Sequence, residues 1–177
     1  MFAGVRSISK TQIDQLGGRL RKGEASDEDI RLLEAYRSSF AEAYEDVVAS
    51  IRKAIQQEPT GRRAKLTRSI IEKLRREKTR LSRMQDIAGC RVVVRDVLAQ
   101  DQVVGRLRAE FAGAKLIDRR KQPSYGYRAV HIIVTAGSKL VEIQVRTELQ
   151  HLWAQLSEKL SDARDRAIKY GGGDPEA

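Results

Sequence analysis

The sequence has few of the residues that would place it in several common classes of protein. Its 177 residues include one cysteine, Cys90, whose apolar-leaning surroundings predict a buried thiol in a reducing compartment. Aromatic residues make up 5%, so the sequence offers no obvious stacking surface for single-stranded nucleic acid. The apolar runs, such as residues 130–134, are far too short to span a bilayer, and the N-terminus lacks the apolar region of a secretory signal peptide. These absences favour a cytoplasmic globular protein without a membrane partner.

Positive charge, by contrast, is abundant. The chain has 34 Lys and Arg residues against 24 Asp and Glu residues, a formal net charge of +10. A balance of this size attracts polyanions such as nucleotides, nucleic acid or an anionic surface. The alternative is that these side chains are spread over helix surfaces and serve solubility. Charge alone therefore indicates an anionic ligand without identifying it.

The segment Ser124–Thr147 has the pattern of a β-hairpin. Two runs rich in Val and Ile alternate with polar residues, and Ala136-Gly137-Ser138 lies between them. Alternation places Tyr127 and His131 on one face of the first strand. On the second strand, it separates three apolar residues from a polar row on the opposite face: Glu142, Gln144 and Arg146. The row is either an ordinary solvated sheet face or the floor of a site that holds polar ligands.

The N-terminal third predicts helices. In residues 1–25, Gly17-Gly18 and Gly23 are expected to break any long helix. Ser26 has the features of an N-cap, since three acidic residues follow it. The apolar spacing from Ile30 to Ile55 then predicts one helix with a buried face, ended by the residues around Pro59.

The next predicted helix carries two neighbouring stripes with a four-residue spacing. Leu66, Ile70 and Leu74 form the expected buried stripe. The neighbouring stripe consists of Lys65, Ser69 and Lys73. Lysines beside a packing face either line the rim of a site or cover apolar surface with their alkyl chains.

A carboxylate, Asp86, precedes a predicted strand at Cys90–Arg95, which suggests a corner for a metal and an anion. The remaining pattern predicts a helix near 100–111, a short strand at 114–117, a basic loop before the hairpin and a flexible glycine-rich tail. A last helix, from about Glu148, is expected to bury a set of large apolar residues: Leu149, Leu152, Trp153, Leu156 and Leu160.

Five motifs in this order resemble those of the Rel/Spo-type alarmone synthetase family. They are R-x-K-x-x-x-S-I-x-x-K-L at 63–74, D-I-A-G-x-R at 86–91, G-Y-R-x-x-H at 126–131, E-I-Q-V-R-T at 142–147 and W-A-x-L at 153–156. The resemblance implies an α/β (α+β) fold with a nucleotidyltransferase-like mixed sheet flanked by helices. It divides the chain into an N-terminal helical extension (1–58), a synthetase domain (59–165) and a tail (166–177).

The resemblance also implies an activity, the transfer of pyrophosphate from ATP to the 3′-hydroxyl of GDP or GTP. In this reading Asp86 and Glu142 are catalytic and bind Mg²⁺, and Glu142 acts near the hydroxyl as a base or orienting group. The implied ATP-binding residues are Arg63, Lys65, Ser69, Lys73 and Arg91, with the two arginines stacked on adenine. The implied acceptor-binding residues are Tyr127, His131, Gln144 and Arg146.

The acceptor is left open, because the chain departs from the family pattern on that side. The usual Pro-Lys pair before Gly126 is absent, and Ala129-Val130 replaces the usual Ser-Leu. An alternative is a toxin that pyrophosphorylates the 3′ end of tRNA, with a basic loop touching RNA: Arg119, Arg120 and Lys121. Further alternatives are an adenine-nucleotide acceptor and an inactive nucleotide- or RNA-binding module. Expected protein partners are a second copy of the chain or a neutralising antitoxin.

Overall fold

A four-stranded mixed sheet forms the centre of the computed structural model, which describes residues 8–61, 64–164 and 172. The strands are β1 (Ala88–Val94), β2 (Lys115–Asp118), β3 (Val130–Ala136) and β4 (Lys139–Thr147). Their order is β1-β4-β3-β2, with β1 parallel to β4 and the other pairs antiparallel. The predicted class, a mixed sheet flanked by helices, is confirmed.

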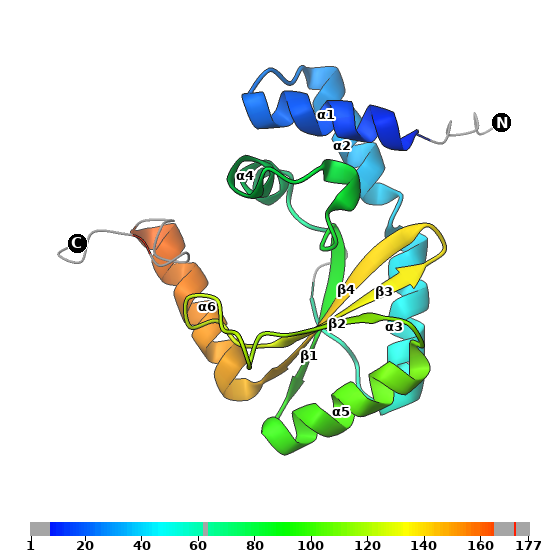
Figure 1. Ribbon diagram of the computed structural model, residues 1–177, viewed down its shortest axis with the longest axis vertical. Helices are drawn as coiled ribbons and strands as arrows, with labels where there is room; N and C mark the ends of the chain where they lie inside the picture. The colour runs from blue at the N-terminus through cyan, green and yellow to red at the C-terminus, as the bar shows by residue number, and fades with distance from the viewer. Residues whose placement is uncertain (1–7, 62–63, 165–171, 173–177) are drawn as a thin grey trace.

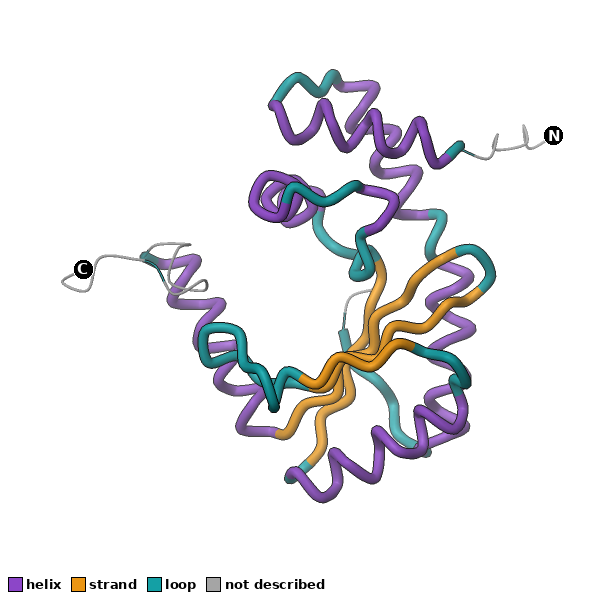
Figure 2. Tube along the Cα trace, viewed as in Figure 1, coloured by secondary structure: helices purple, strands orange, loops and turns teal. Residues whose placement is uncertain are grey.

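Helices cover the two faces of this sheet differently (Figures 1 and 2). They are α1 (Lys10–Lys22), α2 (Asp27–Ser38), α3 (Ala41–Ile55), α4 (Thr67–Glu77), η1 (Leu81–Arg83), α5 (Val97–Glu110) and α6 (Glu148–Ala163). Helices α3 and α5 pack together against one face, whereas α4 and α6 stand apart around the other. No helix in the described part of the chain is long and apolar enough to cross a bilayer.

The β3–β4 hairpin has the predicted arrangement of faces. Val141, Ile143 and Val145 are fully buried against the α3–α5 side. The polar row of β4 therefore lies on the opposite face, toward α4 and α6, as alternation requires. Gly137 forms the turn with φ +56°, in the left-handed region that glycine adopts without steric cost. Tyr127 differs from the prediction, because β3 begins only at Val130 and Tyr127 lies in the preceding turn.

The prediction that Gly17-Gly18 would break the first helix is wrong. Helix α1 runs through both glycines and ends at Gly23, whose φ of +80° makes a left-handed C-cap. At Gly17 a β-carbon would lie 2.8 Å from Cβ of Leu81. The glycine is therefore explained by the close approach of α1 to η1 rather than by a chain break.

The single helix predicted from Ile30 to Ile55 is two helices. The chain turns between α2 and α3, where the Ser39 hydroxyl donates a hydrogen bond to the carbonyl of Tyr36 at 2.6 Å. Phe40 turns inward, is buried and packs edge-on against the Tyr36 ring at 5.2 Å. The apolar spacing is continuous across this turn because both helices bury their apolar faces in the same core.

Of the two predicted buried stripes, the one on α4 is mostly buried and the one on α6 is exposed. In α4, Ile70 and Leu74 are fully buried, but Leu66 is 49% exposed because it precedes the first helical turn. In α6, the prediction is wrong for the whole stripe, since all five large apolar residues are exposed, from 40% at Trp153 to 78% at Leu149. Helix α6 instead turns Ala154 and Ser161 toward the protein.

Candidate active site

A pocket of about 720 Å³ opens between α4, the β1–β4 edge of the sheet and α6. Its lining includes residues from all three, and six of them are sequence-predicted site residues: Lys65, Ser69, Asp86, Arg91, Glu142 and Gln144. The motifs that are far apart in the sequence thus meet at one place. The pocket has two sides, which we name after the roles that the sequence motifs imply: the donor side (around Asp86) and the acceptor side (around Glu142).

On the donor side, one carboxylate binds two lysines. Asp86 lies just before β1, and its Oδ2 and Oδ1 atoms accept hydrogen bonds from Nζ of Lys65 and Nζ of Lys73, both at 2.9 Å. Burial raises the pKa of Asp86, but the charges and hydrogen bonds of the two lysines outweigh burial and leave the pKa below its usual value. The ammonium groups of both lysines therefore meet at Asp86, and a role for them in binding a ligand stays a prediction.

Arg91 reaches the donor side from β1, whose edge is held by the chain that precedes α4. Thr60 and Arg91 exchange backbone hydrogen bonds of 2.7 and 2.5 Å. The next residue, Gly61, has φ +132°, and a β-carbon there would lie 3.2 Å from Cα of Cys90. This close approach brings the segment before Lys65 against the strand. Arg63 lies outside the described residues.

On the acceptor side, five side chains form a closed ring of hydrogen bonds. The Tyr127 hydroxyl lies 2.9 Å from His131 Nε2, and His131 Nδ1 lies 2.8 Å from Glu142 Oε1. Gln144 Nε2 donates to Glu142 Oε2 at 2.7 Å. The guanidinium of Arg146 closes the ring by donating to Gln144 Oε1 at 2.7 Å and to the Tyr127 hydroxyl at 2.9 Å.

The donors and acceptors of this ring fix the roles of its members. A guanidinium can only donate, so the Tyr127 oxygen accepts from Arg146 and its proton is free to point at His131 Nε2. His131 then carries its proton on Nδ1 and donates it to Glu142. With this arrangement of protons every position of the ring is satisfied, and Glu142 is an acceptor at both oxygens.

Glu142 is a buried carboxylate in an ionised state. Burial raises its pKa, but the interaction with His131, first of all the hydrogen bond at Oε1, and the hydrogen bond from Gln144 outweigh burial and leave the pKa below its usual value. The Asp86 charge acts in the opposite direction, which places the two carboxylates within electrostatic reach of each other. At neutral pH Asp86 and Glu142 are therefore both ionised, the first paired with lysines and the second held in the ring.

The turn that carries Tyr127 is packed under α6. Gly126 has φ +81°, and a β-carbon there would lie 2.8 Å from the Trp153 ring. Any larger residue at Gly126 would push this turn away from α6. Trp153 thus contributes to the position of Tyr127 although its own ring is 40% exposed.

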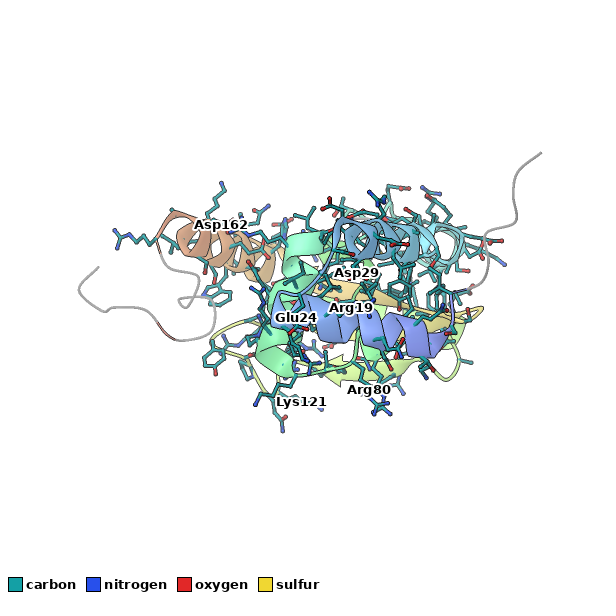
Figure 3. All side chains as sticks on the ribbon, turned by 90° about the horizontal axis from the view of Figure 1, so that it is seen from above. Arg19, Glu24, Asp29, Arg80, Lys121 and Asp162 are labelled. Carbon is teal, nitrogen blue, oxygen red and sulfur yellow. The ribbon has the colours of Figure 1, made fainter. Side chains whose placement is uncertain are left out.

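The predicted RNA-contacting residues lie outside the pocket, in the loop after β2. Arg120 is held by ion pairs with Asp118 at 2.8 Å and Asp101 at 2.7 Å, so its guanidinium is engaged within the protein. Lys121 is exposed and points outward in Figure 3. Arg119 is half-buried beside them.

Two groups of residues near the site were not predicted from the sequence. One is a polar stripe on α6, Gln155, Glu158 and Asp162, which lines the pocket and recurs at a helical spacing that could have been recognised. The other is Arg37 on α2, whose guanidinium contacts the backbone of Lys65. No local pattern marks Arg37, because its partner is 28 residues away.

Comparison with known proteins shows the family of the chain. The family described as the region found in RelA / SpoT proteins matches residues 62–162, more than half of the chain. The chain belongs to this family. All sequence-predicted site residues lie within the RelA/SpoT region, and Arg37 lies outside it.

Relatives within the RelA/SpoT family include proteins of known and unknown function. GTP pyrophosphokinase YjbM of Bacillus subtilis is 34% identical over 132 residues, which cover 66% of this chain and 59% of YjbM. The uncharacterised protein Rv1366 of Mycobacterium tuberculosis is 41% identical over 112 residues, 61% of this chain and 41% of Rv1366. The chain thus spans about half the length of the curated relatives that it matches.

Solved structures in the same family have the same fold. Small alarmone synthetase 1 of Bacillus subtilis bound to its product pppGpp gives a TM-score of 0.63 at 25% identity, covering 82% of this chain and 85% of the synthetase. A GTP pyrophosphokinase family protein of Streptococcus pneumoniae gives 0.59 at 28% identity, covering 86% and 83%. The fold and family expected from the sequence motifs are therefore confirmed.

Proposed function

We propose that this protein is a pyrophosphokinase that transfers the β,γ-pyrophosphate of ATP to the 3′-hydroxyl of GDP or GTP. The 3′-oxygen forms a bond to the β-phosphorus, the bond between that phosphorus and the α,β-bridging oxygen breaks, and AMP leaves. The observation that supports this reaction best is the pair of ionised carboxylates, Asp86 and Glu142, on two sides of one pocket. A module that only bound nucleotides would not need both.

The donor side has the charge that a triphosphate requires. Lys65 and Lys73 hold two ammonium groups beside Asp86, and Lys73 also lies 3.8 Å from Glu77, so an incoming phosphate would meet two cationic groups that it can contact in place of these carboxylates. Ser69 adds a hydroxyl on the same pocket wall. Following the family resemblance, we assign Arg91 and Arg63 to the adenine ring. An ATP donor is also in keeping with the related Bacillus synthetase, whose structure was solved bound to AMPCPP.

The oxygen donors of the pocket fit Mg²⁺. This ion prefers hard oxygen ligands and is usually bound by one or two carboxylates together with substrate phosphates. Asp86 and Glu142 are the residues that would hold it, and each carboxylate oxygen still has a free lone pair beside its present hydrogen bond. When bound, Mg²⁺ would neutralise charge on the transferred phosphates.

The acceptor side has a base in a fixed orientation. Glu142 accepts hydrogen bonds from His131 and Gln144, and these leave lone pairs that can take the proton of a ribose hydroxyl. We assign the Tyr127 ring to stacking on the acceptor base. His131, Gln144 and Arg146 then hold Tyr127 and Glu142 in one arrangement through their ring of hydrogen bonds.

The test is a transfer assay with a choice of acceptors. Purified protein is given Mg²⁺ and β,γ-labelled ATP together with GDP, GTP, adenine nucleotides or deacylated tRNA in parallel. We expect label in guanosine tetra- or pentaphosphate, and none with the Glu142→Gln variant. Wild-type protein that labels no acceptor would contradict the proposed function.

A tRNA acceptor is the second candidate, and one observation favours it. Lys121, beside the acceptor side in sequence, and Arg80, after α4, both point outward along the same edge of the molecule in Figure 3. Basic side chains beyond the nucleotide pocket are what a tRNA acceptor would need. Label on tRNA with none on guanine nucleotides would select this candidate. Adenine-nucleotide acceptors, an inactive module, a second copy of the chain and an antitoxin partner stay predictions.

A further inference from the structure

Arg37, on α2 of the N-terminal extension, reaches the segment that carries a phosphate-binding lysine. Its Nε donates a hydrogen bond of 2.6 Å to the backbone carbonyl of Lys65. Its NH1 group donates to the hydroxyl of Thr67 at 3.1 Å and to the carboxylate of Glu34. The Thr67 hydroxyl in turn donates to Glu34. We refer to Arg37, Glu34 and Thr67 as the Arg37 clamp.

The clamp acts where the backbone has little other support. Lys65 lies in an irregular segment two residues before α4, so helical hydrogen bonds do not hold it. Its backbone N–H donates to the carbonyl of Ile87 at 2.6 Å, on the side of β1. The carbonyl of Lys65 accepts the hydrogen bond from Arg37, which lies on α2. Lys65 is therefore fixed between the sheet and the N-terminal extension.

The clamp also fixes the start of α4. Thr67 is the first residue of that helix, and Leu66, the N-cap, has no side-chain hydrogen bond to the helix. A hydrogen bond from a guanidinium to Thr67 therefore supports a helix end that lacks a capping side chain. Because Lys73 lies on α4, both lysines that bind Asp86 depend on the segment that the clamp holds.

We propose that Arg37 is a positioning residue of the donor site, which acts through Lys65 and makes the N-terminal extension part of the ATP-binding machinery. The inference rests on the proposed function in that ATP is taken as the donor. The Arg37 side chain is only 15% exposed. The hydrogen bond from its guanidinium to the Lys65 carbonyl is charge-assisted and therefore stronger than a neutral one. Moving the Lys65 ammonium relative to Asp86 should weaken ATP binding without disturbing the acceptor side.

A matched control is available in the same extension. Arg19 makes a two-pronged ion pair with Asp29, at 2.6 and 2.9 Å, that joins α1 to α2 and contacts no site residue (Figure 3). Arg19→Gln removes a guanidinium–carboxylate pair from the extension, as Arg37→Gln does. It should lower the melting temperature without a specific effect on ATP.

The experiment measures the affinity of a non-hydrolysable ATP analogue with Mg²⁺ by calorimetry, and the KM values for ATP and GDP. We expect Arg37→Gln to weaken analogue binding and raise the KM for ATP about tenfold, with the KM for GDP within about twofold of wild type. Arg37→Lys, which keeps the positive charge and an N–H donor group but not the planar guanidinium, should recover part of the loss. In a Lys65→Ala background, Arg37→Gln should add a smaller factor than it does in the wild type, because only the route through the start of α4 and Lys73 is left.

Three results would overturn the inference. They are an unchanged analogue affinity in Arg37→Gln, an equal loss in Arg19→Gln, or losses that multiply fully in the Arg37→Gln/Lys65→Ala double variant. If Arg37→Gln fails to fold, the same comparisons are made with Arg37→Lys. Failure of the proposed function has a different signature, since the wild type would then bind the analogue without transferring pyrophosphate, and the binding test of the clamp would still stand.

Discussion

The two sides of the pocket are held in position by different physical means. The donor side is a cluster of charges: Asp86 is shared by two lysines that come from a loop and a helix, and Lys73 also lies 3.8 Å from Glu77. The acceptor side is a closed ring in which Arg146, Tyr127, His131, Glu142 and Gln144 satisfy one another. The donor side is thus suited to attract an anion, whereas the acceptor side is suited to keep a base and an aromatic ring in a fixed geometry.

The difference follows from the elements that carry each side. Pairing of β3 with β4 sets His131 opposite Gln144 and Ile133 opposite Glu142, so the sheet itself fixes the spacing of the ring. The donor lysines have no such register. They depend on where the segment 64–67 and α4 are held, by Ile87 on one side and the Arg37 clamp on the other. Changes on the donor side should therefore alter affinity for anions, and changes on the acceptor side should alter orientation.

The largest effect is expected when the donor carboxylate is removed. Asp86→Asn leaves Lys65 and Lys73 without their shared counter-charge and removes a candidate Mg²⁺ ligand. We expect turnover to fall about 10³-fold, measured as labelled pyrophosphate transferred to GDP over a range of Mg²⁺ concentrations. Asp101→Asn, which breaks an exposed ion pair with Arg120 outside the pocket, is the control. Equal activities of the two variants would refute the assignment of Asp86.

A smaller effect is expected when the ring is opened at its centre. His131→Ala leaves Glu142 without its hydrogen bond at Oε1 and removes one of the two partners of the Tyr127 hydroxyl. We expect turnover to fall about 10²-fold, the lower end for a base that has lost its orientation, with analogue affinity unchanged. Steady-state kinetics with ATP and GDP varied separately give both values. A loss of ATP-analogue affinity would show that the two sides are not independent.

Removing one hydroxyl should have a still smaller effect. Tyr127→Phe keeps the aromatic face but deletes the contacts to His131 and Arg146. We expect a two- to tenfold rise in the KM for the acceptor, about the value of one or two neutral or charge-assisted hydrogen bonds. Tyr127→Ala should raise it much further because stacking is lost as well. If the two variants behave alike, Tyr127 does not stack on the acceptor base.

The ion pair between Arg19 and Asp29 lies outside both sides of the pocket, and we expect it to affect stability but not activity. The hydrogen bond with Arg19 is the main cause that lowers the pKa of Asp29 to about 2. A carboxyl with a lowered pKa in the folded state stabilises the fold above its unfolded pKa, about 3.9, and this contribution is lost as pH falls through the folded value. Asp29→Asn should therefore lower the melting temperature slightly at pH 5–8, and the difference should shrink between about pH 4 and pH 2. Transfer activity at pH 7 should not change.

Thermal unfolding of Arg19→Gln must follow the same pH dependence as Asp29→Asn if the pair acts as described. A difference between wild type and Asp29→Asn that stays constant down to pH 2 would mean that the ion pair does not hold this carboxyl ionised. Any selective loss of ATP affinity in either variant would mean that α1 also helps to position the donor side.

Local sequence periodicity was sufficient to predict which residues are buried where an element packs on its nearest neighbours. Alternation of apolar and polar residues predicted that Glu142, Gln144 and Arg146 share a face, because a strand has only two faces and Val141, Ile143 and Val145 occupy the buried one. The four-residue spacing likewise predicted the burial of Ile70 and Leu74. The family motifs supplied the identity of the site and its sides, which spacing alone did not.

Tertiary structure decided the features that depend on distant partners. Helix α6 has an apolar stripe and a polar stripe, and periodicity cannot tell which one meets the body; the polar stripe with Gln155 and Glu158 lines the pocket and the leucines face outward. Gly17 continues a helix because η1 lies against it, and Arg37 matters because the fold brings Lys65 beside it. The sequence by itself thus determined the strands, most helices and the residue types of the site. Which helix faces are covered, and what holds the lysines in place, depended on contacts between segments that no local pattern encodes.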